Sequence, residues 1–474
     1  MLRLAAALGA AFLAGGTAMA FARVGVPEVD AALARAKVPA DAMVALVQEV
    51  GTGRPRLAWQ ADVPVNPASL MKIVTTTAAL DLLGPAWTWT TPVWLQGPIV
   101  DGVLQGDLVI KGSGDPKLVL ERIWLLLRRV RQMGVRDIRG DVVIDRSAFA
   151  VPEQSPADFD NEPLRPYNAR PDALLLNYRS LLVSFTPDPG RGVATVTVDP
   201  TLAGLRADAT VPLAPGPCDD WRGSLRIDFA DPARLRFPGT FPLACGEKTW
   251  PVAYADPKSY AERLLPALWQ EVGGRLQGGV REGLAPGAPP TIEVVSPSLA
   301  EVVRDINKYS NNVMAQQLFL TLGATQRGLG TFDNARAVVK RWLEEHVGGA
   351  SAEAVLDNGS GLSREGRASA RLLGQVLLWG WSSPSMPELM SSFPLAGADG
   401  TMKRARPAAA HLKTGSLRDV AGVAGYVLAG SGRRYVVVAV VNHANANAAR
   451  PALDALVQWA ADDVAAGGAP ALGR

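Results

Sequence analysis

The pattern of apolar and polar positions predicts strands and a buried helix near the start of the chain. Residues 42–50 and 56–59 read as two strands on either side of a glycine-rich turn. After the breaker pair Asn66-Pro67, the apolar and small residues 73–80 predict a buried helix that ends near Gly84. This region therefore combines both kinds of element.

The middle of the chain has the period of short strands. Residues 193–199 and 225–229 alternate apolar with polar positions, while 118–133 has the spacing of an amphipathic helix. Further segments that read as short strands are 93–95, 108–111, 142–144 and 291–295. The middle is therefore predicted to be rich in β-structure.

The C-terminal part returns to helical spacing. Within it, Tyr435–Val441 is apolar at every position, which predicts a central strand buried on both faces. Segments that read as helices are 260–272, 299–307, 334–347, 448–464 and one beginning at 313. The N-terminal strands and this part are predicted to form one α/β domain, and the middle is predicted to be a long insertion.

Composition describes a globular protein of two or three domains. The chain has 474 residues, 48% of them hydrophobic and 20% charged. Because 48 basic residues nearly balance 45 acidic ones, nothing predicts nucleic-acid binding or a polybasic membrane patch.

The first residues predict export. Arg3 precedes a short apolar run, and Ala18-Met19-Ala20 offers a cleavage site, so 1–20 reads as a signal peptide. An uncleaved membrane anchor is the alternative, but the run is short and rich in Ala and Gly. We expect a periplasmic protein with at most loose membrane association. In that oxidising compartment Cys218 and Cys245 can form a disulfide, although two free thiols remain an alternative.

Three short motifs carry the candidate chemistry. They are Ser69-Leu70-Met71-Lys72, then Ser310-Asn311-Asn312, then Lys413-Thr414-Gly415. The first opens a predicted helix, the second lies between two predicted helices, and the third falls in a predicted strand. This triple is a signature of active-site serine β-lactamases and penicillin-binding proteins, with Asn311 replacing the usual Asp.

The residue types predict a covalent serine mechanism. Ser69 would attack a carbonyl carbon, and Lys72, one helical turn away, would take its proton. Ser310 could relay a proton to the leaving amine, and Asn312 could orient the substrate and bond to Lys72. Substrate contacts are expected from Lys413 and Thr414 to a carboxylate, from Gly415 through close approach of a substrate backbone, and from the N–H groups of Ser69 and Ser416 to an oxyanion.

Histidine and metal chemistry are not expected. The only histidines are His346, His411 and His443, and they lack metal-ligand spacing. A Ser-His-Asp triad would need one of them, and His411 fits better as a strand residue. We therefore expect neither a metal nor an organic cofactor.

With these motifs in place, the chain resembles the D-alanyl-D-alanine carboxypeptidase/endopeptidase family of penicillin-binding proteins, of the penicillin-binding protein 4 type. The first two motif serines lie 241 residues apart (310 − 69), far more than in ordinary β-lactamases. Further segments similar to the family are 111–118, 167–168, 174–177, 308–312, 357–364 and 395–401.

The resemblance implies a fold and a domain order. The fold is α/β (α+β): an antiparallel sheet flanked by helices, a helical subdomain, and two inserted smaller domains. The implied boundaries are 23–88 with 296–474 for the catalytic domain, 89–171 with 251–295 for the outer insertion, and 172–250 for the β-rich inner insertion.

The resemblance also implies a substrate. Such enzymes trim terminal D-alanine from peptidoglycan peptides, cut D-alanyl–diaminopimelate crosslinks, and are acylated by penicillin and other β-lactams. Arg364 and a residue of the insertion, by position Glu162, would hold the diaminopimelate side chain. Compared with the usual family motif, the 357–364 segment either carries one extra residue or begins the motif at Asn358. A β-lactamase and a non-catalytic penicillin-binding scaffold are the alternatives.

Overall fold

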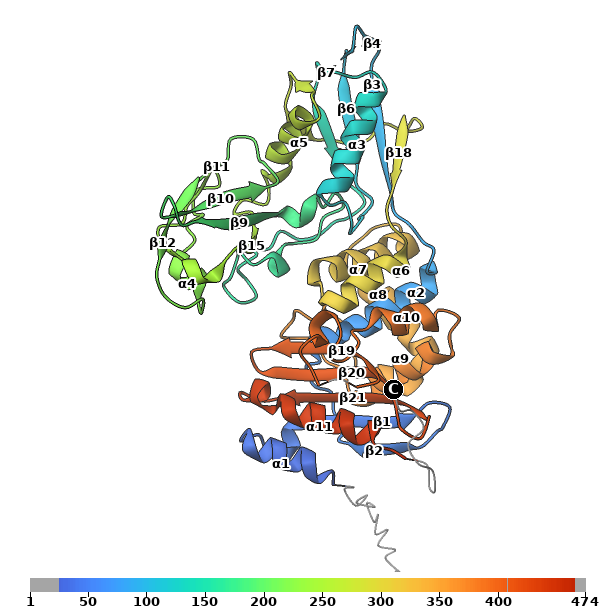
Figure 1. Ribbon diagram of the computed structural model, residues 1–474. Coiled ribbons are helices and arrows are strands. Elements are labelled where there is room, and N and C mark those ends of the chain that lie inside the picture. Colours follow the sequence, from blue (N-terminus) through green and yellow to red (C-terminus); the bar gives the residue numbers. More distant parts are fainter. Residues whose placement is uncertain (1–24, 407, 465–474) are drawn as a thin grey trace, which may run out of the picture.

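The computed structural model describes residues 25–406 and 408–464 (Figure 1). The predicted signal peptide, 1–20, lies outside the described residues. The lower half of Figure 1 holds a sheet wrapped by helices, and the upper half holds the long insertion.

An antiparallel sheet of five strands joins the two ends of the chain. Its order is β19 (Ala410–Leu417), β20 (Val420–Leu428), β21 (Arg434–Asn442), β1 (Met43–Glu49) and β2 (Pro55–Trp59). The predicted central strand is β21, which is the middle strand and is buried along almost its whole length. Because β1 pairs with β21, the N-terminal strands complete the C-terminal half, as predicted.

Helices cover both faces of this sheet. On one face lie α1 (Pro27–Arg35) and α11 (Arg450–Ala461), which share a hydrophobic cluster with it. The other face packs against a second cluster. The helices that build that cluster are α2 (Met71–Leu83), α6 (Leu299–Tyr309), α7 (Asn312–Arg327), α8 (Phe332–Val347), α9 (Ala370–Ser382) and α10 (Met386–Ser392).

The outer part of the insertion contains two sheets. One has the order β17 (Val280–Glu282), β8 (Val142–Asp145), β6 (Asp107–Lys111), β3 (Thr90–Gln96) and β18 (Ile292–Val295). The other has the order β16 (Arg275–Leu276), β7 (Asp137–Ile138), β5 (Val103–Leu104) and β4 (Ile99–Val100). Two helices, α3 (Leu120–Gln132) and α5 (Tyr260–Glu271), contribute buried side chains to the same core.

The inner part, which we call the inner module, is residues 180–253 and is mainly β-structure. Its sheet has the order β14 (Phe241–Pro242), β12 (Thr210–Ala214), β10 (Val193–Asp199), β9 (Ser180–Asp188) and β15 (Lys248–Ala253). A two-stranded pair, β11 (Arg206–Ala207) and β13 (Arg234–Leu235), lies beside it. Its apolar side chains belong to one cluster with those of the outer part, so the insertion has a continuous core. The domain boundaries given above remain a prediction.

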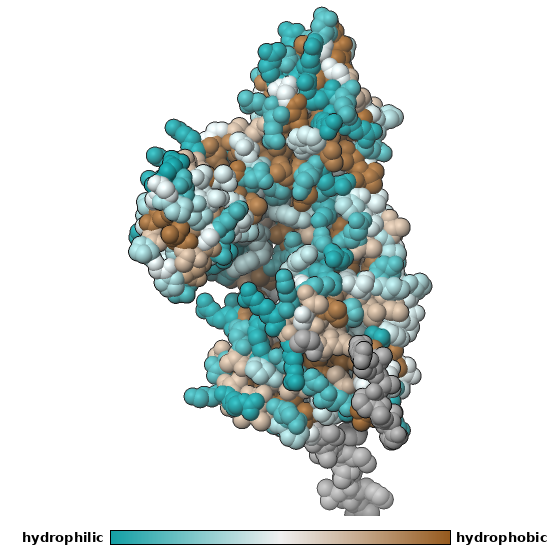
Figure 2. All heavy atoms as spheres, viewed as in Figure 1, coloured by the Kyte–Doolittle hydropathy of each residue, from teal (hydrophilic) through white to brown (hydrophobic). Residues whose placement is uncertain are grey.

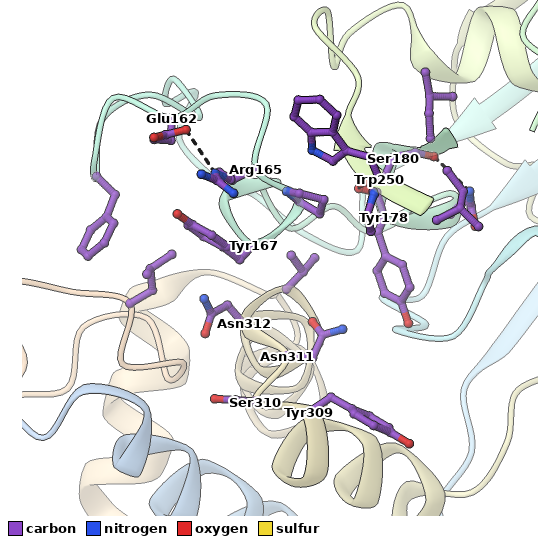
Figure 3. A pocket seen from close by; sticks show the side chains of 18 of the residues that line it. Glu162, Arg165, Tyr167, Tyr178, Ser180, Trp250, Tyr309, Ser310, Asn311 and Asn312 are labelled. Carbon is purple, nitrogen blue, oxygen red and sulfur yellow. Dashed lines mark hydrogen bonds and ion pairs between the residues drawn. The ribbon is translucent and has the colours of Figure 1, made fainter. Parts of the chain in front are cut away.

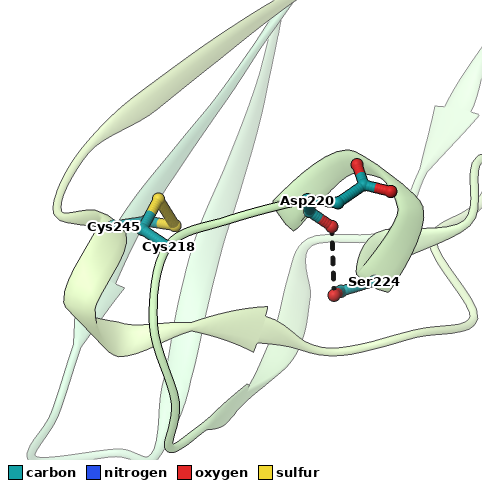
Figure 4. The surroundings of a disulfide bond; sticks show 4 residues. All are labelled: Cys218, Asp220, Ser224 and Cys245. Carbon is teal, nitrogen blue, oxygen red and sulfur yellow. Dashed lines mark hydrogen bonds between the residues drawn. A yellow bond between two sulfur atoms is a disulfide. The ribbon is translucent and has the colours of Figure 1, made fainter.

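The predicted strand at 225–229 is wrong. Short helix α4 (Trp221–Leu225) takes its first residue, because the Asp220 carboxylate caps that helix by accepting from Gly223 N–H at 3.0 Å. The helix ends at Leu225, and the next residue, Arg226, has a φ of 52° that breaks the extended pattern. A Cys218–Cys245 disulfide anchors the loop just before α4 (Figure 4).

Candidate active site

Ser69 lies in a tight turn that runs directly into α2. Residues Ala68–Leu70 form a 3-10 turn, and Ala68 has a φ of 48°, which L-residues rarely adopt. The Asn66 side chain holds this conformation by accepting from Ala68 N–H at 2.9 Å. A Cβ at Gly361 would lie 1.8 Å from the Ala68 carbonyl oxygen, so only glycine fits there. The Ser69 backbone is therefore fixed from two sides, while its side chain lines a cleft.

Lys72 is fully buried beneath Ser69. Its Nζ lies 3.0 Å from Ser69 Oγ, 2.6 Å from Asn312 Oδ1 and 2.6 Å from the Ser360 carbonyl oxygen. Burial, and then the nearby positive charge of Lys413, hold the pKa of Lys72 well below its ordinary value. A neutral amine has two N–H donors and one lone pair. The two oxygens at 2.6 Å can take the donors, which leaves the lone pair facing the Ser69 hydroxyl.

The second motif is placed by the junction of two helices. Ser310 follows α6 in a left-handed conformation (φ 56°), and Asn311 caps α7 by accepting from Met314 N–H at 3.0 Å. Asn311, which replaces the usual Asp, thus caps a helix, and Asn is as good a helix cap as Asp. Asn312, nearly buried, points at Lys72.

Lys413 is the second fully buried lysine. Its Nζ lies 2.9 Å from Ser310 Oγ and 2.7 Å from the Thr414 carbonyl oxygen. Burial lowers the pKa of Lys413 to about 7. The structure therefore places one lysine with lowered pKa beside each motif serine.

The strand β19 presents an open edge to the cleft. Leu412 N–H donates to the Pro394 carbonyl oxygen at 2.9 Å, away from β20. Since N–H directions alternate along a strand, the N–H groups of Thr414 and Ser416 point to the same open side. Ser416 also lines the cleft, and its Oγ accepts from Arg450 at 2.8 Å.

Gly415 serves a different contact from the one predicted. A Cβ at this position would lie 2.8 Å from the Pro67 carbonyl oxygen and 3.1 Å from a Leu70 carbon. The missing side chain therefore lets β19 pack against the turn that carries Ser69. We expected it to admit a substrate backbone; instead the space is filled by the protein itself.

One wall of a cleft of about 1390 Å³ is lined by Ser69, by the second motif (310–312) and by Ser416, which directly follows the third motif. Figure 2 shows the surface hollowed between the inner module and the unit below it. Glu162 and Arg364 line the same cleft. Both side chains already have partners: Glu162 pairs with Arg165 at 3.1 Å, and Arg364 pairs with Asp419 at 3.1 Å and lies over the Phe159 ring at 4.9 Å.

Three groups important to the site were not singled out by the motifs. The Ser360 carbonyl holds Lys72, Thr401 Oγ1 lies 2.7 Å from Thr414 Oγ1, and Lys308 pairs with Asp399 at 2.6 Å. All of them fall in, or directly beside, the family-like segments 357–364, 308–312 and 395–401. The family-like segments therefore located these residues in the sequence but did not predict which groups they contact.

No group of three or more His, Cys, Asp or Glu side chains in the described part of the chain could hold a metal ion. Across residues 25–406 and 408–464, no helix is both long and apolar enough to cross a membrane.

Comparisons with known proteins agree with the motifs. A model of the D-Ala-D-Ala carboxypeptidase 3 (S13) family matches residues 26–463. The D-alanyl-D-alanine carboxypeptidase of Actinomadura sp. (strain R39) is 28% identical over 428 residues, covering 84% of this chain and 78% of that protein. D-alanyl-D-alanine carboxypeptidase DacB of Haemophilus influenzae is 24% identical over 389 residues, covering 79% of this chain and 80% of that protein.

Solved structures confirm the predicted fold class. The crystal structure of penicillin binding protein 4 (dacB) from Haemophilus influenzae superposes with a TM-score of 0.74 at 21% identity, covering 91% of this chain and 98% of that one. The same protein complexed with a β-lactam gives a TM-score of 0.68 at 21% identity, covering 88% and 95%. From the family match over nearly the whole described chain, this protein belongs to the D-Ala-D-Ala carboxypeptidase 3 (S13) family of serine peptidases.

Proposed function

We propose that the protein is a serine DD-peptidase of peptidoglycan that works through an acyl-enzyme on Ser69. It would hydrolyse D-Ala-D-Ala termini and D-alanyl–diaminopimelate crosslinks, and β-lactams would acylate the same serine. The observation that carries this proposal is the pairing of each motif serine with a fully buried lysine: Lys72 with Ser69 at 3.0 Å, and Lys413 with Ser310 at 2.9 Å.

Acylation can proceed with the protons that these pairs hold. Ser69 Oγ forms the bond to the carbonyl carbon while its proton moves to neutral Lys72. The C–N bond then breaks, the amine takes the proton of the Ser310 hydroxyl, and protonated Lys413 restores that proton. Lys72 gains one proton and Lys413 loses one, so the total is unchanged.

Deacylation reverses these roles. A water occupies the place of the departed amine, and it gives a proton through Ser310 to neutral Lys413 as it attacks the acyl carbon. The bond to Ser69 breaks, and Lys72 returns the proton to Ser69 Oγ. Both lysines then regain their starting states.

The remaining site residues would bind substrate. The outward N–H of Ser416 and the N–H of Ser69 would stabilise the oxyanion, and Lys413 with Thr414 would attract the terminal carboxylate. Arg364 and Glu162 are proposed to hold the diaminopimelate side chain, and each would have to exchange its present ion-pair partner for the substrate.

The predicted signal peptide and the Cys218–Cys245 disulfide support a periplasmic location. Peptidoglycan peptides would be the substrate there, with no cofactor required by the chemistry above.

Covalent labelling with a fluorescent penicillin tests the proposal. The mature protein should form a stable adduct on Ser69, identified by mass analysis of the labelled peptide, and Ser69→Ala should form none. Ser391→Ala, which changes an exposed helix serine, is the matched control and should label like wild type. Rapid loss of the label with hydrolysed drug would indicate a β-lactamase instead. No label in a folded protein would leave the scaffold alternative.

A further inference from the structure

The residues that line the cleft lie on two sides of Ser310, so we divide the cleft into two arms. One arm leads past Arg364 and Phe159 to Glu162, the residues already considered for the diaminopimelate side chain. The other arm, which we call the second arm, runs past Tyr309 and Asn311 to the inner module. In Figure 3, Tyr309 and Asn311 point toward the side on which Tyr178 and Trp250 lie, whereas Glu162, Arg165 and Tyr167 lie on the other side.

The position of Ser310 decides which part of a substrate enters the second arm. If Ser310 gives its proton to the leaving amine, the leaving group must lie on the Ser310 side of the broken bond. Tyr309 and Asn311, its neighbours in the chain, line the second arm. A leaving group longer than a single amino acid would therefore extend into that arm.

The size of the cleft fits a long leaving group. Its volume of about 1390 Å³ exceeds the range of roughly 300–1,000 Å³ of ordinary small-ligand sites. Free D-alanine, the leaving group of carboxypeptidase cleavage, is too small to reach the inner module. The leaving strand of a crosslink is a whole second peptide.

The second arm offers a peptide apolar surface and one unpaired cation, while the carboxylates of Glu121 and Asp199 also line the cleft. Tyr309 and Leu182 are 64% and 42% exposed, which offers apolar surface to aliphatic parts of a chain. The exposed Arg222 guanidinium lies over the rings of Trp221 at 4.8 Å and Trp250 at 5.8 Å. No described residue forms an ion pair with Arg222, so its charge is available to a carboxylate on a bound chain.

We infer that the second arm binds the leaving peptide of a crosslink, through the Arg222 cation and the apolar surface of Trp250 and Tyr309. This inference rests on the proposed function and deepens it, because it assigns the inner module to crosslink cleavage and not to removal of terminal D-alanine. The contacts of the leaving peptide lower the barrier only for the substrate that possesses one.

Two substrates separate the second arm from the catalytic residues. We would compare kcat/KM for a purified crosslinked peptide dimer with kcat/KM for the uncrosslinked pentapeptide. In Arg222→Glu, which reverses the charge, the ratio of the two values should fall about tenfold. Trp250→Leu should lower the same ratio by a smaller factor. Arg206→Glu changes another exposed arginine of the inner module, outside the cleft, and should leave the ratio unchanged.

The outcomes are distinct. An unchanged ratio in both variants would overturn the inference, and so would an equal loss on both substrates, which would indicate a general effect on the site. Wild-type protein that cleaves neither substrate and takes no penicillin label would overturn the proposed function, and the inference with it.

Discussion

The two walls of the cleft are built differently. On the wall that carries the motifs, Lys72 and Lys413 are fully buried, and their amines are bonded to the motif residues within 3.0 Å. On the wall formed by the inner module, Leu182 is 42% exposed, and Arg222 has no acidic partner among the described residues. The first wall is fixed before any substrate arrives, and the second offers surface that a substrate could cover.

From this difference we expect the motif wall to carry out the reaction and the inner module to select the substrate. Buried lysines with lowered pKa cost stability, and such groups are kept where a reaction needs them. Exposed arginine and aromatic side chains cost little and gain contacts only when a chain binds. Changes on the motif wall should therefore stop all reactions, whereas changes on the inner module should alter which substrates are used.

Replacing Lys72 should have the largest effect. Lys72→Arg keeps a cation but removes the base, because a guanidinium does not lose its proton in a protein. The rate of penicillin acylation should fall about a thousandfold, within the range of general-base contributions. Stopped-flow labelling measures the rate, and circular dichroism checks that the variant is folded. A folded Lys72→Arg protein that acylates at nearly the wild-type rate would rule out Lys72 as the base.

The next largest effect is expected in the pH dependence of kcat/KM. Protonated Lys413 is needed to restore the Ser310 proton, and its pKa is about 7. The value of kcat/KM for the pentapeptide should therefore decline as pH rises above about 7, and a pH profile from 5 to 10 would show this limb. Lys413→Arg keeps a cation that cannot give up its proton, so its activity should be lower at every pH and should lack that limb. A limb at the same pH in that variant would assign it to another group.

The free energy of unfolding should rise with pH over the range in which kcat/KM declines. In the folded state the pKa of Lys413 is about 7, whereas the ordinary value is 10.5, so the folded state is penalised fully below pH 7 and not at all above 10.5. Lys413→Met should raise the free energy of unfolding at pH 7 by about 2 kcal/mol, since it removes a costly buried charge. Urea denaturation at pH 7 and pH 10 should show this gain shrinking at the higher pH.

The sequence pointed to the residues of the motif wall because each motif holds its side chains at short spacing, and the roles of these residues remain a prediction. Ser69 and Lys72 are one helical turn apart, and the apolar run 435–441 predicted a strand buried on both faces, which β21 confirms. The contact of Lys72 with the Ser360 carbonyl could not be predicted in this way. A backbone carbonyl has no residue type of its own, and its position depends on how distant segments pack.

The second arm could not be predicted from the sequence either, because it also depends on how distant segments pack. Arg222 and Trp250 are far from all three motifs, and only the packing of the inner module brings them to the cleft. The alternation at 225–229 indicated a strand, but α4 ends at Leu225, Arg226 has a left-handed φ of 52°, and only Asp228 forms an isolated bridge, to Arg236.

Removing the Lys308–Asp399 ion pair, which joins the segments 308–312 and 395–401, should have an intermediate effect on kcat/KM. Lys308 precedes Ser310, and Asp399 lies in the loop whose Thr401 contacts Thr414. Asp399→Asn leaves the nearly buried Lys308 ammonium without its partner, so stability should fall by about 1–3 kcal/mol. The value of kcat/KM should fall about tenfold as Thr414 loses its support.

A double variant separates these two effects. Lys308→Met with Asp399→Asn removes the unpaired charge, so it should regain part of the lost stability while activity stays low. Urea denaturation and pentapeptide kinetics measure both quantities. Full recovery of activity in the double variant would show that the ion pair serves folding alone.

The smallest effect on the reaction should come from the disulfide. Cys218 and Cys245 are separated by 27 residues and anchor the loop before α4, which carries Arg222. Changing both to Ser should lower the stability of the inner module by about 3–4 kcal/mol, as expected for a loop of this length. Penicillin acylation should change less than twofold, because the motif wall contributes no residue to this loop. Limited proteolysis should then cut the inner module first, while a large loss of acylation would show that the two walls are not independent.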